Sequence, residues 1–292
     1  MKSEELSLEY LLLGVTALTV TCQNIFKQKF NKRCQSGTFF FTGMISLFAM
    51  IFFLAVNGDW YYSAELLIPS FAFALSYAAA TVFSVLAIYH GSLAKTSLIT
   101  SCSLLIPSFY GMICLGEPVS ATLILGTVLL VVSLIMINYQ KDDTDKKATL
   151  KWAVFVILSF IGNGMCSTVQ KAKPIYYGEQ GNNLFMVVAL AMVTVIMLVS
   201  SLVSKGERES IRPTISKGWL LALLCGVANG LTNYLVIYLN PRLPASVMFP
   251  VISAGSVVLV FIYSVLFNKE KFNIRQSIGF LVGIVSIVLL NI

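Results

Sequence analysis

Amides and hydroxyls inside apolar segments are the side chains of this sequence best suited to bind a ligand. They recur four or seven residues apart, so each group shares one face of a predicted helix. Such groups hold a polar ligand by hydrogen bonds without carrying a charge. The predicted substrate-binding residues are Thr19, Gln23, Asn24, Tyr77, Thr81, Ser97, Ser101, Asn163, Ser167, Asn229, Asn233 and Ser253.

A packing role is the alternative for these residues. Small and hydroxyl side chains normally line the contacts between membrane helices, and Ser or Thr can bond the carbonyls of its own helix. A buried carboxamide differs, because leaving its donors and acceptors unpaired is costly. The stronger binding candidates are therefore the asparagines, Asn24, Asn163, Asn229 and Asn233.

Two lysines occupy matching sequence frames. The pattern C-x4-K-x-K occurs at residues 22–29 and again 144 residues later, at 166–173. It places Lys27 and Lys171 about one turn beyond the polar faces of two predicted helices. We predict that both are gate residues or bind an anionic solute. The alternative is that they are ordinary helix-end lysines, which reach the membrane surface and set topology.

Enzymatic chemistry is not predicted. The sequence shows no catalytic dyad, metal-binding cluster or glycine-rich phosphate loop, and His90 is its only histidine. Glu117 and Glu270 each follow an apolar segment, and we expect them to cap the helices that come next. The sequence therefore predicts no enzyme activity, no cofactor and no metal site.

Membrane helices must position all of these side chains. The chain is 57% hydrophobic and only 11% charged, with a mean hydropathy of +0.84. About 20 apolar residues cross a bilayer as a helix, and continuous apolar runs exclude the alternating strands of a barrel. We predict an all-α membrane protein with ten spans, near residues 6–26, 38–56, 66–88, 94–115, 119–139, 150–170, 183–203, 216–239, 243–267 and 274–291.

The basic residues predict an orientation. Sixteen of the twenty lysines and arginines fall in the loops after every odd-numbered span. The positive-inside rule places these loops in the cytoplasm and both termini outside. The same rule accounts for the net charge of +7 without nucleic acid as a partner. The predicted location is the plasma (cell) membrane, and a monomer is plausible.

The two halves of the chain repeat one another. Residues 1–143 align with 144–292, and near their ends Gly126, Ser133 and Asn138 fall on Gly279, Ser286 and Asn291 at a common offset of 153. Five spans per repeat is an odd number, so the second repeat inserts upside down relative to the first. Inverted repeats of this kind, joined here into one transmembrane domain, are typical of alternating-access carriers.

Residues 104–138 and 257–291 resemble the repeated EamA signature of the drug/metabolite transporter superfamily. Each has a helix, a short hinge with Glu, and a second helix with Gly nine residues later. The resemblance implies a secondary transporter with a central cavity. Because the candidate residues are amides and hydroxyls, we expect a neutral or zwitterionic organic cargo, such as an amino acid or a nucleobase. The alternatives are an anionic cargo, such as a sugar phosphate or nucleotide sugar, and a non-transporting membrane scaffold or receptor.

Overall fold

The protein is described by a computed structural model that covers residues 2–34, 36–56, 58, 60–90, 99–100, 102–138, 150–266 and 274–290. In these ranges the chain forms ten α-helices, two short 3-10 helices and no strand. The all-helical fold is therefore confirmed. The helices are α1 (Lys2–Cys34), α2 (Thr38–Val56), α3 (Leu67–His90), α5 (Leu105–Cys114), α6 (Ala121–Asn138), α7 (Leu150–Tyr177), α8 (Asn182–Val203), α9 (Lys205–Leu239), α10 (Ala245–Leu266) and α11 (Ile274–Leu290), with the 3-10 turns η1 (Ala64–Leu66) and η2 (Cys102–Leu104).

Each predicted span contains one described helix, although three helices are longer than predicted and α5 is shorter. Helix α5 covers only Leu105–Cys114 of the span predicted at 94–115, and residues 94–98 and 101 of that span lie outside the described residues. Six helices are long and apolar enough to cross a membrane, and shorter apolar helices accompany them. Helix α1 continues to Cys34, α7 continues to Tyr177, and α9 begins at Lys205. Hydropathy marks only the apolar part of a helix, whereas Lys, Arg and Gln also favour the helical state. Lys27 and Lys171 consequently lie inside helices and not beyond their ends.

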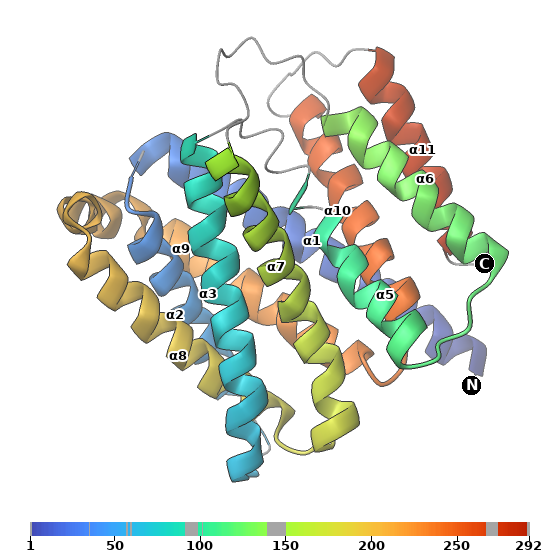
Figure 1. Ribbon diagram of the computed structural model, residues 1–292, viewed down its shortest axis with the longest axis horizontal. Helices are drawn as coiled ribbons and strands as arrows, with labels where there is room; N and C mark the ends of the chain where they lie inside the picture. The colour runs from blue at the N-terminus through green and yellow to red at the C-terminus, as the bar shows by residue number, and fades with distance from the viewer. Residues whose placement is uncertain are drawn as a thin grey trace.

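Two glycines allow pairs of helices to approach closely. A Cβ on Gly162 of α7 would lie 2.7 Å from the backbone nitrogen of Ala80 in α3. A Cβ on Gly226 of α9 would lie 2.8 Å from the carbonyl oxygen of Ile45 in α2. Small residues have this role in many membrane helix pairs. Figure 1 shows α3 beside α7, with α2, α8 and α9 grouped at one edge of the bundle.

Helices α6 and α11 lie side by side at the opposite edge of the bundle (Figure 1). Two matching hydrogen bonds join them. The Ser133 hydroxyl donates to the Gly279 carbonyl at 2.7 Å, and the Ser286 hydroxyl donates to the Gly126 carbonyl at 2.8 Å. Ser133 follows Gly126 by seven residues, and Ser286 follows Gly279 by seven. The two helices therefore run antiparallel where these bonds form.

Glu207, in the first turn of α9, caps the N-terminus of α2. Its carboxylate accepts hydrogen bonds from the backbone amides of Thr38 at 3.1 Å and Phe39 at 2.9 Å. These amides have no partner within their own helix, and the positive end of the helix dipole attracts the carboxylate. Glu207 thereby fastens the second half of the chain to the first.

Replacing Glu207 with Gln is expected to lower the free energy of unfolding by about 1 kcal/mol, because the charge at the helix N-terminus is lost. Thermal unfolding of the detergent-purified variant measures the change. The matched control is Glu209→Gln, which removes the same charge from an exposed position of the same helix. Equal midpoints for the two variants would contradict the capping role.

Candidate functional site

Buried carboxamides link α1 to α9. The Gln23 amide donates to the Thr232 hydroxyl at 2.7 Å, and the Asn229 amide donates to the Gln23 side-chain oxygen at 2.9 Å. The Thr19 hydroxyl lies 2.7 Å from that of Thr232. Thr19, Gln23 and Asn229 are each less than a tenth exposed. Three of the predicted binding residues therefore meet at one place in the bundle.

The same network continues from α9 to α7. The Asn233 amide donates to the Asn229 side-chain oxygen at 3.1 Å, and the Gln170 amide donates to the Asn233 side-chain oxygen at 2.7 Å. The Asn240 amide donates to the backbone carbonyl of Gln170 at 2.8 Å. We call Thr19, Gln23, Gln170, Asn229, Thr232 and Asn233 the amide network.

Helical spacing explains why these groups meet. Asn229 and Asn233 are four residues apart and share one face of α9. Asn240, the residue that directly follows the helix, is seven residues beyond Asn233 and continues the same face. Thr19 and Gln23 share a face of α1 by the same four-residue spacing. Helices α1 and α7 both contact α9. The polar face of α9 thus lies between polar residues of α1 and α7, and these residues form hydrogen bonds with its buried amides.

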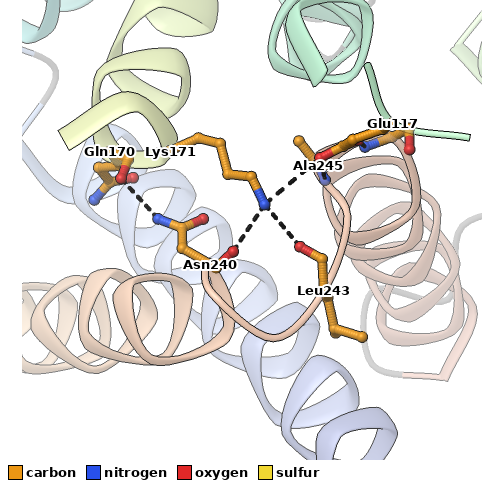
Figure 2. A network of polar contacts seen from close by, with 7 residues as sticks. Glu117, Gln170, Lys171, Asn240, Leu243 and Ala245 are labelled. Carbon is orange, nitrogen blue, oxygen red and sulfur yellow. Dashed lines mark hydrogen bonds and ion pairs between the residues drawn. The ribbon is translucent and has the colours of Figure 1, made fainter. Parts of the chain in front are cut away.

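Lys171 lies at one end of this chain of contacts. Its ammonium group donates to the carbonyls of Asn240 and Leu243, each at 2.8 Å, and lies 3.6 Å from a carboxylate oxygen of Glu117. Lys171 is only 5% exposed. Figure 2 shows its side chain extending from α7 to the turn that joins α9 and α10. A buried charge is costly without partners, and Lys171 has three.

Glu117 caps a helix other than the expected one. Its carboxylate accepts from the amides of Ala245 at 2.7 Å and Ser246 at 2.9 Å, so it caps α10, whereas the sequence predicted that it would cap the next helix, α6. Helix α5 packs along α10, and this contact places the residues after α5 at the N-terminus of α10. The corresponding prediction for Glu270 lies outside the described residues.

Two buried oxygens beside this ion pair have no hydrogen-bond partner in the part of the chain that the structure describes. They are the side-chain oxygen of Asn240 and the hydroxyl of Ser246. Asn240 is 3% exposed and Ser246 is 1% exposed. Because buried polar atoms are usually satisfied, the surroundings of the ion pair have unused capacity to bind a polar group.

A cavity of about 230 Å³ borders the same α9–α10 turn. Pro241 and Arg242, which directly follow Asn240, form part of its wall, and Glu179 contributes a negative charge. The remaining lining residues are Asn182, Asn183, Tyr234, Ile237 and Tyr238. The cavity thus lies beside the turn that holds the Lys171 ammonium group.

The other predicted residues lie outside the amide network. The Thr81 hydroxyl bonds the Tyr77 carbonyl of its own helix at 2.9 Å. The Asn163 amide donates to the Ser103 hydroxyl at 2.6 Å, a separate contact between α7 and η2. Ser253 is buried in α10. Of the rest, Ser167 is half-buried, Asn24 and Lys27 are exposed, and Ser97 and Ser101 lie outside the described residues.

Sequence reasoning missed Gln170, Thr232 and Asn240, and it did not pair Glu117 with Lys171. Gln170 and Asn240 lie at the predicted ends of their spans, where the hydropathy falls. Residues at span ends were assigned to the membrane boundary, so neither was considered for the interior site. Thr232 is three residues from Asn229, a spacing that signals a shared face. For metals, no group of three His, Cys, Asp or Glu side chains comes together within the described ranges.

These features define an integral membrane protein of the helical-bundle class, in which polar side chains are gathered between the helices. Residues 150–292, which make up nearly half of the chain, match the EamA-like transporter family. The match confirms the predicted family resemblance, and it suggests a membrane transporter of small molecules.

Comparison with solved structures supports the fold over 96% of the chain. Among 28 matching chains, one described as "Crystal structure of protein" has a TM-score of 0.75, covers 96% of this chain and 97% of its own, and is 11% identical in sequence. At that identity the likeness shows a shared fold alone. No curated protein matches the chain in sequence.

Proposed function

We propose that the protein is a secondary carrier that moves a small polar organic solute, neutral or zwitterionic, across the plasma membrane by alternating access. The observation that carries this proposal is the amide network, which gathers buried hydrogen-bonding groups from α1, α7 and α9. Carboxamides and hydroxyls offer both donors and acceptors, as a cargo like an amino acid or nucleobase requires.

Alternating access rests on the proposed inverted repeat of residues 1–143 and 144–292. The matching bonds of Ser133 to Gly279 and of Ser286 to Gly126 support it, because each bond becomes the other when the two halves are exchanged. The antiparallel course of α6 and α11 agrees with an axis in the membrane plane. In such carriers the two repeats rock about a shared central site.

The equivalent lysines support a structure closed at one mouth only. Lys171 is buried and held by three groups, whereas Lys27 is exposed. In the proposed orientation Lys171 lies at the outer mouth and Lys27 at the cytoplasmic mouth. We infer that Lys171 closes the outer mouth in this conformation and releases it in the other.

The two alternatives remain distinct. An anionic cargo would need Lys27 and Lys171, but the ammonium group of Lys171 already lies beside the Glu117 carboxylate, which repels anions. A scaffold would require no interior binding groups, and both a scaffold and a receptor predict no saturable solute flux. The amide network therefore favours a carrier of a neutral or zwitterionic solute.

Uptake by proteoliposomes tests the function. Replacing Gln23 with Leu leaves the amide of Asn229 without its acceptor, so we expect kcat/KM for the cargo to fall roughly tenfold or more. Gln180→Leu is the control, because it removes the same group from an exposed position. A panel of amino acids, nucleobases, sugars and phosphates identifies the cargo. Wild-type vesicles that show no saturable uptake of any class would favour the scaffold alternative.

A further inference from the structure

We propose that Lys171 and Glu117 recognise the two charges of a zwitterionic cargo, which inserts between them as the outer mouth opens. The ammonium group of Lys171 would then pair with the cargo carboxylate, and the carboxylate of Glu117 would pair with the cargo ammonium group. This inference rests on the proposed function and narrows its substrate class to solutes that carry both charges.

The ion pair joins parts of the chain that must separate if this mouth opens. Lys171 belongs to α7, Glu117 follows α5, and both hold the turn between α9 and α10. Figure 2 shows the Lys171 ammonium group between the carbonyls of Asn240 and Leu243 and the Glu117 carboxylate. Opening the mouth therefore pulls apart two buried, opposite charges.

Separating a buried pair is strongly unfavourable when either charge is left without a partner. A zwitterion avoids this penalty, because its carboxylate faces the lysine while its ammonium group faces the glutamate. A simple anion compensates only Lys171, a simple cation compensates only Glu117, and a neutral solute compensates neither. The pair thus selects for the cargo that lets the mouth open with every charge paired.

The unsatisfied oxygens fit the same ligand. A primary ammonium group has three hydrogens to donate, and the side-chain oxygen of Asn240 and the hydroxyl of Ser246 are both buried without partners in the described ranges. Both residues contact the ion pair through their backbones, because Lys171 donates to the Asn240 carbonyl and Glu117 accepts from the Ser246 amide. An open pocket near the same turn has charges of both signs in its wall, from Glu179 and Arg242.

The experiment compares solutes that differ by one charge. Each amino acid of a panel is tested with the amine that lacks its carboxylate, the acid that lacks its ammonium group, and the neutral N-acetyl amide, in which both charges are blocked. Both binding, as a thermal shift of the detergent-purified protein, and uptake by proteoliposomes are measured. For the wild type we expect the single-charge and neutral analogues to be at least roughly tenfold weaker than the amino acid.

The double variant Lys171→Met/Glu117→Gln removes both charges, so that no buried charge is left without a partner. We expect it to lose this discrimination, so that amino acid and analogues differ by no more than about twofold to threefold. Wild-type uptake of a neutral or singly charged solute as efficient as that of the zwitterion would overturn the inference and leave the carrier proposal standing. A double variant that still prefers the amino acid to its analogues by roughly tenfold would also overturn the inference. If the double variant does not fold, the wild-type comparison decides alone. Absence of uptake for every solute class would overturn both proposals.

Discussion

Replacing Lys171 with Met is expected to lower the free energy of unfolding by about 3–5 kcal/mol, the usual consequence of stranding one member of a buried ion pair. The carboxylate of Glu117 would remain buried at the N-terminus of α10 without its counter-charge. The carbonyls of Asn240 and Leu243 would each lose a donor as well. Unfolding midpoints of the detergent-purified protein measure the loss.

Two further variants separate the ion pair from a general effect of lysine. Lys27 is the sequence equivalent of Lys171 but is exposed, so Lys27→Met should change stability by less than about 0.5 kcal/mol. Lys171→Met/Glu117→Gln should recover much of the lost stability, because no charge is left unpaired. A double variant as unstable as the single one would show that packing of the lysine stem matters more than its charge.

Replacing Gly162 with Ala is expected to destabilise the protein by about 1–3 kcal/mol through overpacking. The new methyl group would meet the backbone of α3, at 2.7 Å from the nitrogen of Ala80 and 2.9 Å from the carbonyl oxygen of Ser76. Backbone cannot rotate away as a side chain can, so α3 and α7 must move apart.

Gly14→Ala is the matched control for this substitution. Its Cβ would meet nothing within 4 Å, and alanine favours the helix by about 0.8–1.0 kcal/mol over glycine. We therefore expect its unfolding midpoint to equal or exceed that of the wild type. If the unfolding midpoint of Gly162→Ala also equals or exceeds that of the wild type, the contact between α3 and α7 can accommodate a methyl group and the overpacking argument is wrong.

Hydropathy predicted the helices well because each one must satisfy its own backbone within lipid. The span predicted at 38–56 coincides with α2. The prediction was poorest at the polar ends, where α7 runs seven residues beyond the expected end at 170, to Tyr177. There, Lys173 is buried because its ammonium group finds the carbonyls of Gly178 and Gln180. Hydropathy cannot foresee such partners.

Periodicity located one stripe of the candidate site but could not pair it with another. Asn233 was predicted from its spacing within α9, and so was Gln23 within α1. Asn229 was predicted because a buried amide needs hydrogen-bond partners. The hydrogen bond between Asn229 and Gln23 joins residues that are more than 200 positions apart in the sequence. The ion pair of Lys171 with Glu117 likewise depends on how α5, α7 and α10 pack, and no local pattern encodes that arrangement.

The exchange of helix caps between the halves has a consequence for how the protein is made. Glu117, from the first half, caps α10, and Glu207, from the second half, caps α2. Phe39 leaves the ribosome 168 residues before the glutamate that its amide will bind. At about 5–20 residues per second, α2 must wait on the order of 10–30 s for its cap. The nascent first half therefore enters the membrane with an open helix end, which water, headgroups or the insertion machinery must satisfy until α9 is synthesised.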